Sequence, residues 1–129
     1  MRRVIAVVPD LFFASRITAT AKAAGVDLSL LGMPQALDRI TSEPPDLVLL
    51  DLNADGDAPA LVRALKLNER TRSVSVVAFG SHVETERLKA VREAGAEYAM
   101  ARSAFTVLLP KLLRGEPLGK IDEAREGEA

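Results

Sequence analysis

Residues 44–53 read PPDLVLLDLN, and this stretch decides the fold class of the chain. The paired prolines end any preceding helix, because proline cannot continue a helical hydrogen-bond ladder. From Leu47 to Leu52 every residue except Asp51 is apolar. So little alternation between apolar and polar residues is typical of a parallel sheet that helices cover on both faces. The stretch therefore predicts a buried central strand with a carboxylate at its end.

Four other short apolar runs accompany this one along the chain. Together they predict five strands, at residues 4–8, 26–31, 47–52, 74–79 and 97–101. The segments between them have helical patterns of about 10 to 15 residues, the length that a right-handed crossover between parallel strands needs. The sequence thus predicts an α/β fold with a five-stranded parallel sheet and about five helices.

Local signals indicate where several helices begin and end. Pro34 suits the first turn of the second helix, and Asp57 can cap the third. Ser81 and Glu84 have the S-x-x-E spacing of a capping box ahead of the fourth helix. Gly95 is expected to end that helix in a left-handed conformation.

The chain is expected to form one domain with a short tail. The first helix is predicted over 13–24 and the last over 104–113, where Pro110 predicts either a bend or a delayed start. Residues 1–114 then make up the domain. Residues 115–129 lose apolar periodicity and are rich in charge, so we expect a flexible tail.

The composition excludes several classes of protein. In 129 residues, 17 basic and 18 acidic side chains leave a net charge of −1, which offers no excess positive charge for nucleic acid. There is no cysteine and a single histidine, His82, which argues against disulfides, thiolate catalysis, a Ser-His-Asp triad and a histidine-rich zinc site. The apolar run at 4–8 is too short for a signal peptide or membrane span, so we expect a cytoplasmic location.

Two carboxylates are expected at one edge of the sheet. Asp10 follows the first strand and Asp51 ends the third, and open parallel sheets bind ligands beyond the carboxyl ends of their strands. If the two strands are neighbours, the carboxylates face each other across one crevice. Paired acidic oxygens near a backbone carbonyl suit Mg²⁺, which prefers oxygen ligands and retains several waters. Alternatively, Asp10 caps the first helix and Asp51 is a turn residue with its own hydrogen bonds.

Three stretches resemble the receiver domains of response regulators: VIAVVPDLFFASRI at 4–17, PPDLVLLDLN at 44–53 and VREAGAEYAMARSAF at 91–105. The resemblance covers residues 3–114, nearly the whole expected domain. It implies a flavodoxin-like sheet in the order 2-1-3-4-5. It also implies phosphorylation of Asp51 by a sensor histidine kinase, with Mg²⁺ held by Asp10, Asp51 and the main-chain carbonyl of Asn53.

The chain departs from the receiver pattern where the family holds its metal and senses phosphorylation. Pro9 replaces the first of two acidic residues, and losing such a supporting group commonly costs roughly 10- to 100-fold in metal affinity. Gly80 stands where the family has a Thr or Ser, with Ser81 one residue further on. Arg102 replaces the family's Lys, whose ammonium has a different geometry. The candidate switch or phosphoryl-contact residues are Gly80, Ser81 and Arg102. Alternatively, Ser81 caps a helix and Arg102 is a solvated surface residue.

All four phenylalanines are expected at the carboxyl-end rim of the sheet: Phe12, Phe13, Phe79 and Phe105. Helix periodicity can bury only one of Phe12 and Phe13 well, so the other is expected to be exposed. An apolar interaction rim formed by Phe12, Phe13 and Phe105 can seal the pocket or bind a partner. The alternative is ordinary packing beneath the crossover loops.

These observations favour a signalling protein over an enzyme. The first hypothesis is a stand-alone receiver in a two-component phosphorelay, with Asp51 as the phosphoacceptor. The alternative is a pseudo-receiver that acts by protein contact without phosphorylation. An enzyme or flavin carrier fits less well, because the chain has neither a G-x-G-x-x-G motif nor a P-loop. The sequence leaves open whether the protein is a monomer or a homodimer.

Overall fold

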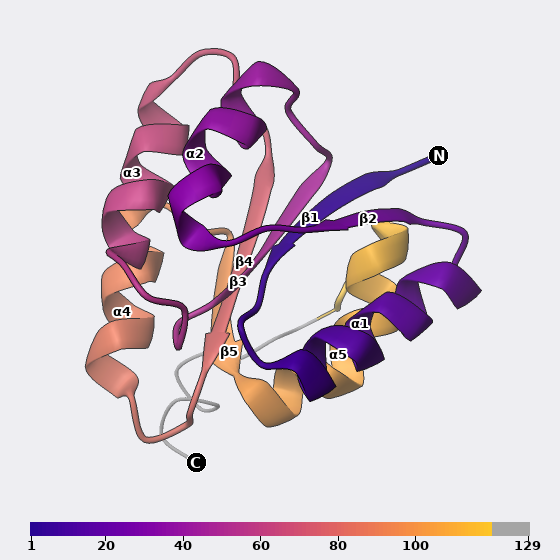
Figure 1. The fold of residues 1–129 in the computed structure, drawn as a ribbon. Coiled ribbons are helices and arrows are strands. Elements are labelled where there is room, and N and C mark those ends of the chain that lie inside the picture. The colour runs from indigo at the N-terminus through magenta and orange to yellow at the C-terminus, as the bar shows by residue number, and fades with distance from the viewer. Residues whose placement is uncertain (120–129) are drawn as a thin grey trace.

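A five-stranded parallel sheet lies between two layers of helices in the computed structural model, which describes residues 1–119 (Figure 1). In chain order the elements are β1 (Arg3–Val7), α1 (Leu11–Ala23), β2 (Asp27–Leu30), α2 (Met33–Ser42), β3 (Leu47–Asp51), α3 (Ala58–Leu67), β4 (Ser75–Gly80), α4 (Thr85–Ala94), β5 (Tyr98–Ala101) and α5 (Arg102–Arg114). The strand order is β2-β1-β3-β4-β5, and every neighbouring pair is parallel. The predicted flavodoxin-like fold is confirmed.

The sheet separates two hydrophobic cores of different composition. Helices α1 and α5 cover one face, and α2, α3 and α4 cover the other (Figure 1). The core beneath α1 and α5 contains Phe13, Phe79 and Phe105, whereas the buried cluster on the other face is aliphatic. Every residue of β3 is buried, as its nearly continuous apolar run predicts. The register of β3 and β4 places Asp51 beside Phe79.

Three of the predicted helix signals are confirmed. At the start of α3, Asp57 Oδ1 accepts a hydrogen bond from Ala60 N at 2.9 Å, and Pro34 lies in the first turn of α2. Gly95 follows α4 with φ of +121°, a conformation that L side chains rarely adopt. A Cβ at Gly95 would also lie 2.8 Å from Lys66 Cγ, so both the backbone and the available space favour glycine.

The predicted capping box at Ser81 and Glu84 is wrong. Helix α4 begins at Thr85, and Glu84 occupies its N-cap position without a side-chain capping bond. Residues 81–84 form a turn of their own, in which Glu84 N donates to Ser81 O at 3.0 Å. The Glu84 carboxylate pairs instead with Arg87, one turn into the helix. The carboxylate that the capping box needs is therefore engaged elsewhere.

Helix α5 begins at Arg102, two residues before the expected start, so the delay predicted from Pro110 is wrong. Pro110 lies inside the helix, and the apolar residues Phe105, Leu109, Leu112 and Leu113 are buried beneath it. This packing offsets the hydrogen bond that proline removes. Residues 116–119 follow without helix or strand, and residues 120–129 of the predicted flexible tail lie outside the described residues.

Candidate functional site

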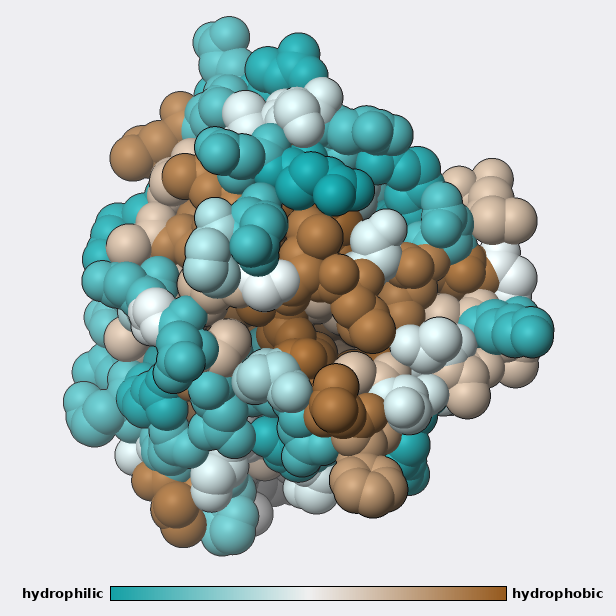
Figure 2. Space-filling view, in the orientation of Figure 1, coloured by the Kyte–Doolittle hydropathy of each residue, from teal (hydrophilic) through white to brown (hydrophobic). Residues whose placement is uncertain are grey.

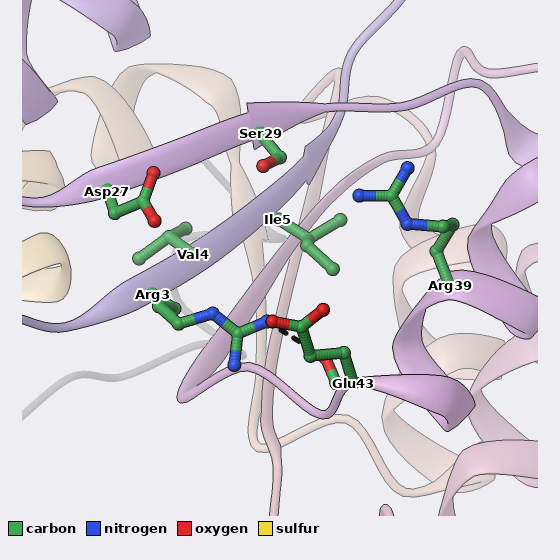
Figure 3. Close-up of a pocket in the computed structure, with 7 residues that line it drawn as sticks. All are labelled: Arg3, Val4, Ile5, Asp27, Ser29, Arg39 and Glu43. Carbon is green, nitrogen blue, oxygen red and sulfur yellow. Dashed lines mark hydrogen bonds and ion pairs between the residues drawn. The ribbon is translucent and has the colours of Figure 1, made fainter.

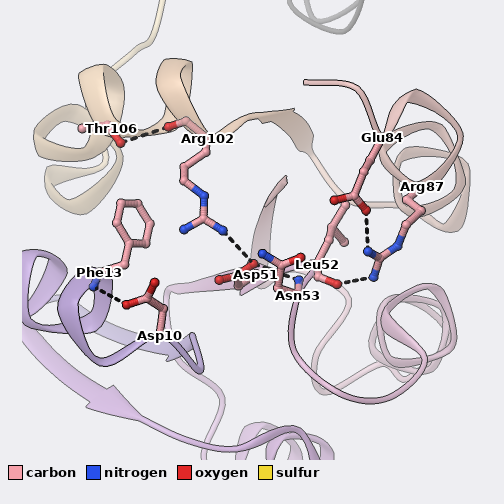
Figure 4. A network of polar contacts seen from close by, with 9 residues as sticks. All are labelled: Asp10, Phe13, Asp51, Leu52, Asn53, Glu84, Arg87, Arg102 and Thr106. Carbon is pink, nitrogen blue, oxygen red and sulfur yellow. Dashed lines mark hydrogen bonds and ion pairs between the residues drawn. The ribbon is translucent and has the colours of Figure 1, made fainter. Parts of the chain in front are cut away.

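Asp51 is the last residue of β3, and its side chain is fully buried. Oδ1 accepts a hydrogen bond from Asn53 N at 2.9 Å and forms an ion pair with Arg102 Nη2 at 3.5 Å (Figure 4). Oδ2 is buried without a hydrogen-bond partner. A buried carboxylate oxygen without a partner is costly to keep in a folded protein, so this atom marks a candidate binding position.

Burial raises the pKa of the Asp51 carboxyl above its ordinary value. The hydrogen bond from Asn53 N and the charge of Arg102 lower this pKa, whereas the negative charges of Asp10 and Glu84 raise it further. Loss of water around the carboxylate dominates, because an ionised group is poorly stabilised where neither water nor enough donors reach it. The site therefore favours either a proton or a cation near Asp51.

Arg102 closes the site from the start of α5. Its guanidinium carbon lies 4.8 Å from the centroid of the Phe13 ring and 5.5 Å from that of Phe79. The Phe79 and Phe105 rings are stacked at 4.0 Å, and Phe13 is tilted against both. We call Phe13, Phe79 and Phe105 the aromatic cluster. Since Phe13 and Phe79 of this cluster hold the guanidinium by cation–π contact, Arg102 is not the solvated surface arginine of the alternative interpretation.

The aromatic cluster corrects the predicted interaction rim. Phe105 and Phe79 are fully buried and Phe13 is 8% exposed, so Phe13 and Phe105 cannot form an exposed rim. The three rings fill the space between α1, β4 and α5, a contact that no spacing in the sequence indicates. Of the four phenylalanines, Phe12 alone is exposed, at 88%.

Asp10 stands at the edge of the same site. Its Oδ1 accepts a hydrogen bond from Phe13 N at 3.1 Å, so the predicted helix cap is present. Figure 4 shows the carboxylates of Asp10 and Asp51 and the guanidinium of Arg102 directed toward one shared space. The residue is exposed, and its charge raises the pKa of Asp51 across that space. Asp10 thus both caps α1 and faces Asp51.

Neither Gly80 nor Ser81 forms a hydrogen bond with Asp51. Gly80 is buried at the end of β4, where a Cβ would lie 3.2 Å from Leu52 Cδ1 and 3.3 Å from Leu52 Cβ. A side chain at position 80 would therefore need Leu52 to shift by a few tenths of an ångström. Ser81 Oγ accepts a hydrogen bond from Val83 N at 3.4 Å, within its own loop.

Sequence reasoning missed the part that Arg87 plays. Arg87 extends from α4, donates to the main-chain carbonyl of Leu52 and pairs with Glu84 (Figure 4). The turn that follows Asp51 is thereby tied to the start of α4. The three-residue spacing of Glu84 and Arg87 was the available signal, because residues so spaced share one face of a helix.

The donor groups at this site suit at most a sparsely ligated cation. The oxygen donors that the receiver resemblance assigns to an ion are Asp10 after β1, Asp51 at the end of β3 and the main-chain carbonyl of Asn53. Among residues 1–119, no group of three or more His, Cys, Asp or Glu side chains is placed to hold a metal ion. The buried Oδ2 of Asp51 nevertheless fits a hard cation, and Mg²⁺ keeps several waters even in sites with one or two carboxylates.

No protein-family model matches the chain, and no curated protein matches its sequence. Solved structures do match its fold. The chemotaxis response regulator CheY4 of Vibrio cholerae has a TM-score of 0.77 at 17% identity, covering 89% of this chain and 98% of its own. The receiver domain of a DNA-binding response regulator from Colwellia psychrerythraea has a TM-score of 0.74 at 21% identity, over 84% and 93%. The receiver domain of a Pseudomonas aeruginosa sensor histidine kinase, with a magnesium ion in its active-site cleft, has a TM-score of 0.73 at 17% identity, over 87% and 97%. The chain therefore has the receiver fold.

Proposed function

We propose that the chain is a receiver-like signalling domain that acts by binding another protein and is not switched by phosphorylation of Asp51. One observation carries the proposal: the Asp51 carboxylate is fully buried beside Arg102, whose guanidinium rests on the aromatic cluster. The positive charge of Arg102 thus pairs with one carboxylate oxygen, Oδ1, and the other oxygen, Oδ2, is buried, so neither oxygen is open to a phosphodonor. The central site of the receiver fold is closed by internal contacts.

Phosphoryl transfer to Asp51 would demand more than this site offers. The accepting oxygen and the donor must approach each other in line, with cations to neutralise the transferred charge. Oδ2 is the oxygen without a hydrogen bond, but it is buried, so neighbouring side chains would have to move first. At the end of β4, where receivers carry a hydroxyl, Gly80 is packed against Leu52.

A second candidate function, phosphorelay through Asp51, is favoured by a different observation. Asp51 Oδ2 has no partner, and the Asp10 carboxylate faces the same space. Mg²⁺ would be held there by Asp10, Asp51 and the main-chain carbonyl of Asn53, and would neutralise charge on a phosphoryl group. Such a site would be weak, because Pro9 supplies no third carboxylate. The partner in this function would be a sensor histidine kinase.

Both functions share several expectations. The domain is proposed to be a non-enzymatic cytoplasmic module whose partner is a protein, acting as a monomer or a homodimer. Its net charge of −1 argues against nucleic acid as the partner. Within residues 1–119, no helix is both long and apolar enough to cross a membrane.

Intact mass spectrometry separates the two functions. The full chain is incubated with Mg²⁺ and acetyl phosphate, alongside Asp51→Asn and a receiver domain known to accept phosphate from this donor. We expect the competent receiver, but not this chain, to gain the mass of one phosphoryl group. A gain in the wild type that Asp51→Asn abolishes would establish the phosphorelay function instead.

A further inference from the structure

An open apolar groove lies at the same edge of the sheet as Asp51. It is bounded by the start of α1, the ends of β1 and β2, and the loop after β3, and its volume is about 400 Å³. Its lining includes Val7, Leu11, Leu30, Leu31 and Met33. Figure 2 shows apolar side chains gathered around a hollow in the middle of this face. We call this feature the α1–β2 groove.

The groove exposes large apolar side chains to water. Leu11 is 82% exposed and Leu30 is 48% exposed, and Phe12, next to Leu11 in α1, is 88% exposed. Core packing does not need Leu11 or Phe12, because Phe13 and Ala14 are the buried residues of this helical turn. Burial of apolar surface stabilises a complex, and contiguous exposed apolar surface is typical of interaction sites.

The walls of the groove are held in place without a ligand. Pro9 lines it from the loop after β1 and Pro34 from the first turn of α2, and their rings fix the local main-chain φ angles. Met33 lies against Gly56, where a Cβ would come within 2.7 Å of Met33 Cγ and where φ is +119°. The loop after β3 therefore approaches Met33 closely only because residue 56 is glycine. A preformed groove loses little conformational freedom when it binds a partner.

The charged groups at the groove are acidic. Asp55 lines it, and Asp10 stands between two lining residues, Pro9 and Leu11. The Asp10 carboxylate is exposed and uses Oδ1 to cap α1. Among the residues of 1–119 that line the groove, none is Lys or Arg. A partner with an apolar side chain in the groove and a basic side chain at its edge gains both apolar burial and charge complementarity.

We infer that the α1–β2 groove binds a peptide segment of a partner protein in which a large apolar residue is flanked by lysine or arginine. The inference rests on the proposed protein-binding function and names its surface and partner chemistry. A second copy of this chain fits less well. A two-fold contact through the same face would place two copies of the acidic groove edge, with Asp55 in its lining, in one interface, and such like charges repel.

A phage-displayed library of random peptides tests this inference. The full wild-type chain is the target, and the Leu11→Ser variant is used for counter-selection. We expect enriched peptides to carry Leu, Ile, Phe or Met beside Lys or Arg. Synthetic copies should bind Leu11→Ser about tenfold more weakly than the wild type, because an anchoring apolar contact is lost. Leu67→Ser is the matched control, since Leu67 is also exposed, at 84%, but lies at the far end of α3.

The methionine methyl NMR signals locate the bound peptide. Met33 lines the groove, whereas Met100 is fully buried in the core beneath α1 and α5. Enriched peptides should shift the Met33 methyl signal and leave that of Met100 in place. A bound peptide that leaves the Met33 methyl signal unshifted would place the binding surface elsewhere and overturn the inference.

Other outcomes also overturn it. These are enrichment of acidic peptides, equal binding to wild type and Leu11→Ser, or no enrichment at all. A wild-type dimer in sedimentation that Leu11→Ser dissociates would assign the groove to a second copy. Phosphoryl transfer to Asp51 would contradict the proposed function and leave peptide binding in the groove intact, so the two failures are distinguishable.

Discussion

The Asp51 site and the α1–β2 groove lie at the same edge of one sheet, with Asp10 between them. The side chains of the site contact one another, whereas large apolar side chains of the groove are exposed to water. At the site, Asp51 is buried beside Arg102, and the aromatic cluster holds the guanidinium. In the groove, Leu11 and Leu30 are exposed although both are large and apolar. The site is closed by contacts within the chain, and the groove is open.

The two regions differ in the binding energy that they leave available to a partner. A partner at the Asp51 site must displace an ion pair and a cation–π contact before it gains anything. A partner in the groove gains burial of apolar surface that the chain leaves in water, with no internal contact to break. In this receiver fold, the surface best suited to a partner therefore lies beside the central carboxylate and not on it.

A substitution in the aromatic cluster tests whether the closed site belongs to the core. Phe105→Ala should lower the free energy of unfolding by about 3 to 5 kcal/mol, because it leaves a cavity under α5. Phe12→Ala should change this free energy by less than about 0.5 kcal/mol, since its side chain is exposed. Guanidinium denaturation of both variants measures the difference. Equal losses of stability would contradict the contrast between the two regions.

The next effect concerns Arg102 as the internal counter-charge of Asp51. In Arg102→Met, Mg²⁺ should bind about tenfold more tightly than in the wild type, a gain of about 1.4 kcal/mol, because the competing cation is gone. Arg63→Met, in the exposed part of α3, removes the same charge away from the site and serves as the control. Titration calorimetry gives the affinities. An unchanged affinity in Arg102→Met would show that Arg102 does not compete with a cation.

Much of the fold could be predicted because its signals are local. The strand at 47–52 shows its burial on both faces in its own residues, and Asp57 and Gly95 act on the main chain next to them. The capping box predicted at Ser81 and Glu84 was wrong because Glu84 pairs with Arg87. Arg87 also contacts Leu52, and this contact joins two segments that are distant in the sequence. A capping motif predicts a helix start only when its carboxylate has no stronger partner.

The candidate site was harder to predict than the fold. The positions of Asp10 and Asp51 follow from the strand order, so the carboxylates could be placed at one edge. The burial of Phe13 and Phe105 depends on how α1 packs against α5, and no periodic pattern encodes that contact. The groove is formed by residues of separate loops, so no motif relates Leu11 to Leu30.

A third, smaller effect is expected from Asp51→Asn, which should raise the free energy of unfolding at neutral pH by about 1 kcal/mol. Burial raises the pKa of Asp51 above its ordinary value of 3.8, so ionisation of Asp51 disfavours the folded state. This cost is absent below that ordinary value, grows as pH rises and is complete above the pKa of the folded state. Urea denaturation of both proteins across pH measures it. A wild type that is the more stable at neutral pH would show that Arg102 outweighs desolvation.

The smallest expected effect comes from Asp10→Asn, at the boundary between the two regions. Asparagine caps helices as well as aspartate and can still accept the bond from Phe13 N, so stability should change by less than about 0.3 kcal/mol. Asp10→Ala, which loses the cap, should cost about 1 kcal/mol. Because the charge of Asp10 raises the pKa of Asp51, Asp10→Asn should lower that pKa in an NMR titration of the carboxyl groups. An unchanged Asp51 pKa would mean that the charge of Asp10 does not act on Asp51.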